Sequence, residues 1–181
     1  YDTTKILQNY CLLEKNVTPP KALPKATTII RIPLQRAAVF SSVHLALLQE
    51  LYDIRQVRGV CDTQFIIDQN LQALIQHRRL TNYGGSLRPD LELLVATRAD
   101  ALLVSSLVDV DRPELRKMGI PIIECADYLE TSALGRSEWV KFFGLLFGKG
   151  QAADSIFRQV EDRYQSLTRQ VRTLRQRPSL L

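Results

Sequence analysis

The chain contains few of the residues from which metal and disulfide centres are built. Only three of its 181 residues are cysteine and two are histidine. Cys11, Cys61 and Cys125 lie far apart, without a Cys-x-x-Cys pair and without a histidine that would complete a metal set. This spacing predicts neither a metal site nor a disulfide framework. Because Cys61 and Cys125 end apolar segments, we expect both thiols to be buried.

Long apolar runs are also missing. No stretch reaches the roughly 18 apolar residues that a membrane-spanning helix requires. The densest one, from Trp139 to Phe147, is interrupted by Lys141 and Gly144 and predicts a buried helix. With 45% hydrophobic and 24% charged residues, the composition is that of an ordinary globular protein. The length suffices for one well-cored domain, with or without appendages.

The short motifs of several enzyme classes are absent from the sequence. No Gly-x-Gly-x-x-Gly follows the first predicted strand, and there is neither a Walker lysine nor a Gly-x-Ser-x-Gly elbow. The net charge of +5 comes largely from arginines near the carboxyl terminus. Glu161 and Asp162 accompany these arginines, and no aromatic residues are interleaved as a stacking platform. The pattern favours a solvated helix face, and we expect no nucleic acid partner.

The sequence does contain a recurring strand–turn–helix pattern. Short apolar segments at Ala37–Phe40, Gln56–Cys61, Ala101–Val104 and Ile120–Glu124 are separated by intervals long enough for crossover helices. Strands that are joined by such crossovers form parallel sheets. We therefore predict an α/β fold, consisting of a parallel-sheet Rossmann-like lobe with flanking helices.

Helices are predicted between and after these strands. Ser41 or Ser42 is a suitable N-cap for the first helix, and Phe65 and Ile66 are expected to face inward in the second. The predicted helices cover residues 42–51, 65–76, 89–97 and 113–119, a segment that follows Gly135 and ends at Phe147, and residues 151–175.

Composition divides the chain into three parts. Residues 1–32 are β-like at Lys5–Leu13 and Thr27–Ile32, around a connector with three prolines, and predict an N-terminal β extension. Residues 33–150 form the α/β lobe. Residues 151–177 carry an apolar stripe at helical spacing. This stripe predicts a helix that is roughly 35–40 Å long and leads away from the lobe.

Candidate ligand-binding residues follow from the position of the predicted loops. In an open parallel sheet, ligands bind outside the carboxyl ends of the strands. Tyr83 and Tyr128 lie on predicted loops and are suited to stacking on a flat ligand, whereas Trp139 either packs in the core or lines the cleft. We assign ligand binding to seven residues: Ser42, His44, Asp62, Tyr83, Ser106, Tyr128 and Trp139.

Two arrangements in these loops would support chemistry. His44 and Asp62 could form a base and its orienting carboxylate near Ser42, the outline of a hydrolase. Alternatively, His44 caps the first helical turn or touches a ligand. Glu124 and Asp127 could form a carboxylate pair, or could cap a helix and face solvent. No residue is assigned to catalysis, to a metal or to a cofactor.

The order of the motifs resembles the amino-terminal lobe of an ABC-importer substrate-binding protein. The branch concerned handles iron-siderophores, haem and cobalamin, and the likeness extends over about residues 30–175. The segments that carry it are Val57-Arg58-Gly59-Val60, Leu91-Glu92-Leu93-Leu94, Ala99-Asp100-Ala101-Leu102-Leu103, the Gly119-Ile120-Pro121-Ile122 step and Phe143-Gly144-Leu145-Leu146-Phe147-Gly148-Lys149.

This resemblance implies a binding function and no enzymatic activity. In the family, two lobes are joined by one rigid helix and hold the ligand between them, and a glutamate on each lobe docks onto arginines of the membrane permease. Glu92 matches the first-lobe glutamate. The expected partners are an ABC permease and a metal chelate or corrinoid, and the expected location is the periplasm, either free or through a lipid anchor.

The chain departs from the family in two ways. Arg98-Ala99-Asp100 stands where the family has Lys-Pro-Asp, and the sequence ends where a second lobe is expected, which predicts a fragment that holds the amino-terminal lobe and the interdomain helix. Two other functions remain open. One is an α/β hydrolase-like enzyme that uses Ser42, His44 and Asp62. The other is an interaction module in which the stripe of the last helix pairs with another chain.

Overall fold

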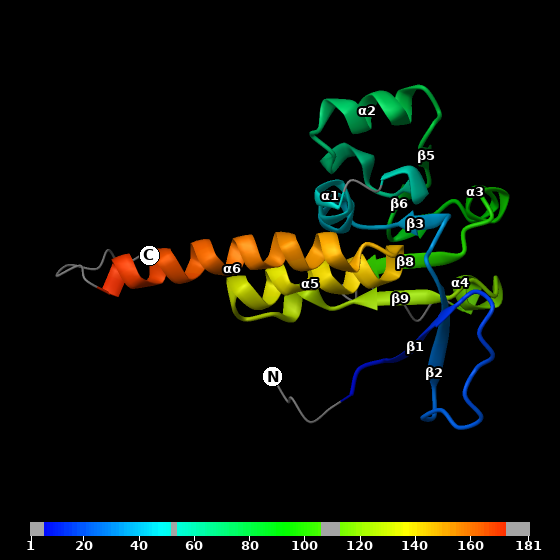
Figure 1. The fold of residues 1–181 in the computed structure, drawn as a ribbon. Coiled ribbons are helices and arrows are strands. Elements are labelled where there is room, and N and C mark those ends of the chain that lie inside the picture. Colours follow the sequence, from blue (N-terminus) through cyan, green and yellow to red (C-terminus); the bar gives the residue numbers. More distant parts are fainter. Residues whose placement is uncertain (1–5, 52–53, 106–112, 173–181) are drawn as a thin grey trace.

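A five-stranded parallel sheet forms the centre of the molecule. A computed structural model describes residues 6–51, 54–105 and 113–172. The strand order is β5-β4-β3-β8-β9, and every neighbouring pair is parallel, which confirms the predicted α/β fold (Figure 1). The strands are β3 (Ala37–Val39), β4 (Val57–Val60), β5 (Thr81–Asn82), β8 (Ala101–Ser105) and β9 (Ile122–Cys125).

The order of the strands gives the sheet one topological switch point. From β3 the chain proceeds outward through β4 to β5, and it then returns to the other side of β3 to form β8 and β9. The switch point therefore lies between β3 and β8, where Ala38 is in register with Leu102. Loops on either side of such a point diverge and leave room for a ligand at the carboxyl edge.

Alternate residues of the central strands enter two different apolar clusters. Ala37 and Val39 of β3 pack with α1 (Ser42–Glu50) and α5 (Ala133–Phe147) on one face. Ala38 and Phe40 pack on the other face with α3 (Leu91–Ala96) and α4 (Pro113–Lys117). Burial on both faces explains why these strands read as continuous apolar segments. The predicted burial of the Cys61 and Cys125 thiols is confirmed.

Three short 3₁₀ turns and a small hairpin connect these elements. The turns are η1 (Ile54–Gln56), η2 (Thr63–Phe65) and η3 (Asp127–Leu129). The hairpin pairs β6 (Gly84–Gly85) with β7 (Arg88–Pro89) in antiparallel fashion. The remaining helix on this side is α2 (Gln69–Gln76), whose Leu71 reaches the cluster beneath α1.

Three helix starts differ from the predicted ones by two residues or more. The helix α3 begins at Leu91 rather than at residue 89, because Asp90 is its N-cap. The prediction that Phe65 faces inward is wrong, since its side chain is 66% exposed. The reason is that Asp68 caps α2 by accepting a hydrogen bond from the backbone N–H of Leu71, so Phe65 lies ahead of the helix in η2. The helix α5 begins before Gly135, because Ser132 accepts from the Gly135 N–H and starts the helix at Ala133.

The amino-terminal extension is a two-stranded parallel sheet. β1 (Asn9–Glu14) pairs in register with β2 (Thr27–Ile32), in agreement with the predicted β character of this region. The extension is tied to the edge of the main sheet, because the backbone N–H of Glu124 donates to the Tyr10 hydroxyl over 2.8 Å.

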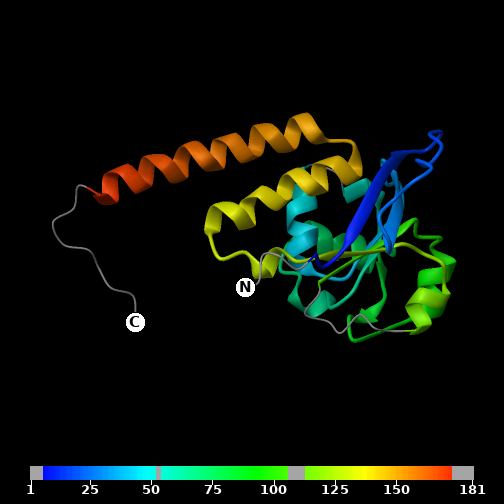
Figure 2. The same ribbon diagram turned by 90° about the horizontal axis from the view of Figure 1, so that it is seen from below.

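The carboxyl-terminal helix α6 (Gly150–Arg172) folds back along α5. Gly148 ends α5 with a φ of +70°, a conformation that glycine adopts without strain, and the chain then reverses direction. Gly144 allows the two helices to approach closely, because a Cβ there would lie 2.4 Å from the Cβ of Ala153. Figures 1 and 2 show α6 running beyond α5, and Figure 1 shows that it also passes the carboxyl ends of β8 and β9.

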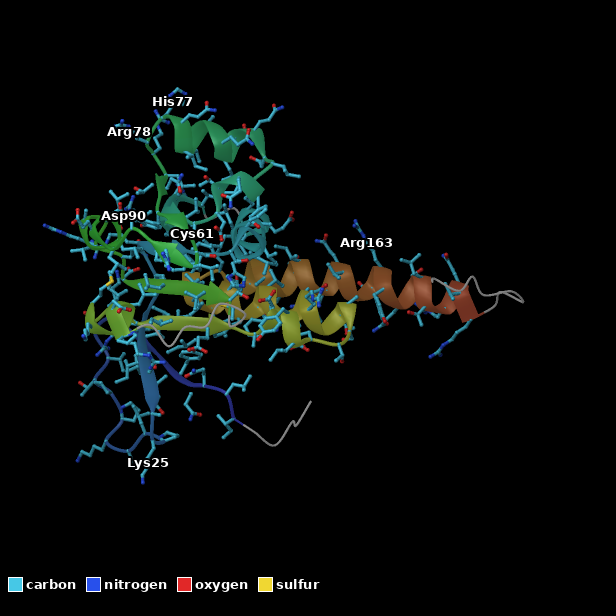
Figure 3. All side chains as sticks on the ribbon, turned by 180° about the vertical axis from the view of Figure 1, so that it is seen from behind. Lys25, Cys61, His77, Arg78, Asp90 and Arg163 are labelled. Atoms are coloured by element: carbon cyan, nitrogen blue, oxygen red, sulfur yellow. The ribbon has the colours of Figure 1, made fainter. Side chains whose placement is uncertain are left out.

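The outer surface of α6 is polar and basic. Arg158, Arg163, Arg169 and Arg172 are exposed, and Figure 3 shows Arg163 projecting away from the body of the protein. Exposed apolar side chains follow one another along a second line on the same helix: Val160, Tyr164, Leu167 and Val171. None of the helices within the described ranges is both long enough and apolar enough to cross a membrane.

Candidate functional site

The carboxyl edge of the sheet collects polar residues from three strands. Ser41 and Ser42 follow β3, Asp62 follows β4 and Asp127 follows β9. The parallel pairing brings these positions to the same edge, on the side toward which α6 extends. Ser41 caps α1 by accepting a hydrogen bond from the backbone N–H of Val43 at 3.3 Å. The first turn of α1 therefore lies at this edge as well.

Asp62 fixes the loop that follows β4. Its φ of 52° is left-handed, and its backbone N–H donates to the Gly84 carbonyl at 2.8 Å. Its Oδ1 accepts from the Ser86 N–H at 3.1 Å. These two bonds hold the β6–β7 hairpin against the carboxyl end of β4. Asp62 is thus a structural anchor of the edge, and its side chain stays partly exposed there.

His44 is buried and paired with Asp127. The side chain is 1% exposed, and its Nε2 lies 2.9 Å from Oδ1 of Asp127. A carboxylate can only accept, so Nε2 carries the proton in this bond. The imidazole also packs against the ring of Phe143, with 5.4 Å between ring centroids. Within the described residues its Nδ1 has no hydrogen-bond partner.

This pairing bears on the hydrolase arrangement that the sequence leaves open as an alternative. His44 joins the start of α1 to η3 across the sheet, and its partner is Asp127 rather than Asp62. For Asp127, neither the carboxylate pair with Glu124 nor the alternative of solvent exposure is found, because its carboxylate is buried and bonded to His44. The Ser42, His44 and Asp62 loops therefore do not assemble a base with its orienting carboxylate in this structure.

Tyr83 is part of the core. Its ring is fully buried, so the expectation that it offers an exposed stacking surface is wrong for this structure. The hydroxyl pairs with Oγ1 of Thr97 at 2.8 Å, and burial raises the pKa of Tyr83. The ring lies over Gly59, where a Cβ would come within 2.4 Å of the tyrosine Cζ. A glycine in the middle of a buried strand was the sequence signal for this close approach.

Trp139 lines a groove at the open edge of β9. Its indole N–H donates to Oε1 of Glu130 at 3.1 Å, and the side chain is half-buried. We name the cavity of about 320 Å³ around it the aromatic groove; it is lined by Tyr10, Glu124, Glu130, Gly135, Glu138, Trp139 and Phe142. A neighbouring cavity shares Tyr10, Glu124 and Trp139 and continues to Tyr128 at the carboxyl end of β9.

Sequence reasoning missed the contribution of Tyr10 to this groove. Burial is the largest cause that raises the pKa of Tyr10 to about 12, and the nearby charges of Glu124 and Cys125 act in the same direction. The hydroxyl accepts a hydrogen bond from the Glu124 N–H. The β-like pattern of residues 1–32 predicted a strand here but did not indicate which edge it would approach.

The other predicted site residues are placed as follows. Glu92 is exposed on the first turn of α3, whose N-cap is Asp90, labelled in Figure 3. Ser42 and Tyr128 are partly exposed at the carboxyl edge, whereas Ser106 lies outside the described residues. In the ranges that the structure describes, no group of three histidine, cysteine or acidic side chains could hold a metal ion.

Comparison with solved structures finds the same fold in periplasmic binding proteins. The molybdate-binding protein MolA of Haemophilus influenzae matches with a TM-score of 0.66 and 17% identity, over 80% of this chain and 50% of that protein. The siderophore-binding protein BauB, solved with two molecules of acinetobactin and ferric iron, matches with a TM-score of 0.62 and 18% identity, over 79% of this chain and 50% of that protein. A periplasmic haem-binding protein from Pseudomonas aeruginosa matches with a TM-score of 0.59 and 20% identity, over 76% of this chain and 47% of that protein.

One curated protein of similar sequence is an uncharacterized lipoprotein of Methanocaldococcus jannaschii. It is 28% identical over 142 residues, which cover 74% of this chain and 34% of the lipoprotein. No protein-family model matches the sequence. The chain thus spans about a third of that relative and about half of each solved structure. At these identities the likeness is one of fold, that of one lobe of ABC-transporter substrate-binding proteins.

Proposed function

We propose that this chain is the ligand-binding lobe of an ABC importer's substrate-binding protein. The observation that carries the proposal is the direction of α6, which runs past the carboxyl ends of β8 and β9 (Figure 1). A second lobe attached to this helix would face the edge where open parallel sheets bind their ligands. The matches to siderophore-, haem- and molybdate-binding proteins support this arrangement.

In this proposal each of the three predicted parts of the chain has its own role. Residues 33–150 supply the lobe, residues 151–177 the connecting helix, and residues 1–32 the β extension. The exposed apolar stripe of α6, which includes Tyr164 and Leu167, supports a role as an interdomain helix, since it would be covered by further parts of the protein. The same stripe is what favours the alternative of a helix-mediated interaction module.

The ligand would be an iron chelate, haem or cobalamin, with an oxyanion such as molybdate as a further class suggested by MolA. Ser42, Asp62 and Tyr128 are the proposed contacts, because each is partly exposed at the carboxyl edge. His44 contributes by fixing η3, and thereby Tyr128, relative to α1. Such a site selects its ligand by shape and by a few polar groups and needs no catalytic residue.

Docking to the permease would use Glu92. An exposed carboxylate on the rigid first turn of a helix can form charge-assisted, geometrically selective hydrogen bonds to arginine. The lipoprotein relative and the periplasmic matches support an extracytoplasmic location, with a lipid anchor as one means of attachment.

Calorimetry with a ligand panel tests the proposal. The protein expressed from its complete gene is titrated with haem, cyanocobalamin, a ferric hydroxamate and molybdate. We expect saturable binding of at least one of them, weakened by Ser42→Ala and Asp62→Asn and unchanged by Glu114→Gln on the exposed face of α4. Absence of binding to every member of the panel, or an affinity that is unchanged in both Ser42→Ala and Asp62→Asn, would contradict the proposal.

A further inference from the structure

The aromatic groove has a continuous wall of three rings. The ring of Phe142 lies between those of Tyr10, at 6.4 Å between centroids and 39° between planes, and Trp139, at 5.6 Å and 85°. The rings are held from both sides. The Tyr10 hydroxyl accepts the Glu124 N–H, and the Trp139 indole donates to Glu130. Aromatic rings carry negative π-electron density on their faces, and that density attracts positive charge.

The carboxylates of the groove are used unequally. Glu130 already accepts the indole N–H, and Glu138 pairs with Lys141 at 3.0 Å. Glu124 offers a third carboxylate, which makes no hydrogen bond or ion pair with any residue that the structure describes. The groove therefore combines aromatic rings with a carboxylate that no described residue holds in a hydrogen bond or ion pair, and Arg116 lines an adjoining cavity together with Glu124.

The nearby lysine does not supply the missing positive charge. Lys141 lies on α5 next to the groove, but its Nζ is 3.9 Å from the ring centroid of Phe157 on α6. It is thus engaged between Glu138 and Phe157.

We propose that the aromatic groove binds a small organic cation, a quaternary ammonium or protonated amine, through the aromatic rings and the Glu124 carboxylate. Aromatic faces attract such cations, and the attraction increases when the cation is partly desolvated in a cavity. The volume of about 320 Å³ is sufficient for a group of this size. The inference goes beyond the proposed import function and does not depend on it, because it stands on the groove alone.

The protein offers a direct optical probe for this site. Trp139 is the only tryptophan in the chain, so intrinsic tryptophan emission comes from a side chain that lines the groove. The protein is titrated with choline chloride at constant ionic strength while this emission is followed. In parallel it is titrated with 3,3-dimethylbutan-1-ol, the uncharged analogue of choline with the same shape. We expect a saturable change with choline and a change at least roughly fivefold weaker in affinity with the alcohol.

Two matched variants test whether the Glu124 carboxylate contributes to choline binding. Glu124→Gln keeps the shape of the side chain and its backbone hydrogen bond to Tyr10, and it should weaken choline binding by roughly fivefold or more. Glu114→Gln, on the exposed face of α4, should leave the affinity unchanged. No saturable change with choline, equal affinity for choline and the alcohol, or full affinity in a folded Glu124→Gln variant would each overturn the inference. The comparison of the two ligands on the unmodified protein decides the matter if the variant fails to fold.

Discussion

Nε2 of His44 lies 2.9 Å from Oδ1 of Asp127, although the two residues are 83 positions apart in the chain. This bond joins the start of α1 to η3 and so fixes two of the loops at the carboxyl edge. Because His44 is buried, the bond is formed where water cannot replace either partner.

Removing the acceptor should therefore destabilise the fold. Asp127→Ala leaves the buried N–H of His44 without a partner, and we expect a loss of about 2–3 kcal/mol in the free energy of unfolding. Asp127→Asn keeps an acceptor and should lose less. Urea unfolding followed by circular dichroism measures both, with Asp154→Ala on the exposed face of α6 as the control. A loss below about 0.5 kcal/mol in Asp127→Ala would show that the bond is not stabilising.

A second prediction concerns the contact between α5 and α6. A methyl group at Gly144 would lie 2.4 Å from the Cβ of Ala153 and 3.2 Å from the Lys149 carbonyl oxygen. Gly144→Ala should force the helices apart and cost about 1–3 kcal/mol in the free energy of unfolding. Gly150→Ala is the matched control, because nothing lies within 4 Å of the Cβ position there. Equal unfolding midpoints for the two variants would argue against this close approach.

The alkaline stability of the protein should depend on Tyr10. Its pKa is raised to about 12 in the folded protein from 10.0, so the fold favours the neutral hydroxyl. The unfolded chain releases this proton at lower pH, and stability is therefore fully present below pH 10 and lost as pH rises from 10 toward 12. Comparing the stability of the unmodified protein with that of the Tyr10→Phe variant over this pH range isolates the effect. Ultraviolet titration of tyrosine ionisation in both proteins should give a difference with a midpoint near 12. A midpoint near 10 would contradict the burial of this hydroxyl.

An uptake assay in cells should distinguish docking to the permease from ligand binding. Glu92→Lys places a positive charge where we propose that the permease presents arginines, and like charges repel. We expect uptake in cells to fall at least about tenfold, while calorimetry on the purified variant shows unchanged ligand affinity. Glu114→Lys, a comparable charge reversal on α4, serves as the control. Uptake that is equally reduced by both substitutions would point to a non-specific effect of charge.

The sequence predicted the parallel sheet because its strands are buried on both faces. Ala37–Val39 and Ala101–Val104 are apolar throughout, and capping serines and aspartates mark the helices between such strands. The long last helix was equally evident, since its apolar stripe recurs at helical spacing over six turns. Local patterns of this kind need no knowledge of distant contacts.

The parts that could not be predicted depend on contacts between distant segments. The spacing of His44 gave no reason to prefer Asp127 over Asp62, and only the strand order brings η3 beside α1. The aromatic groove requires Tyr10 to meet Glu124, 114 residues later in the chain. The burial of Tyr83 depends on the space that Gly59 leaves. Each of these is a property of the tertiary arrangement.

Hydrogen exchange measured with and without bound ligand tests the central claim most directly. The protein from its complete gene is saturated with whichever member of the panel binds, and amide exchange is followed by mass spectrometry. We predict added protection in the peptides that contain Ser42, Asp62 and Tyr128, at the carboxyl edge of the sheet, and none in α4 at the opposite end. Protection confined to α4, or to the amino-terminal ends of the strands, would contradict the assignment of this edge as the ligand-binding face.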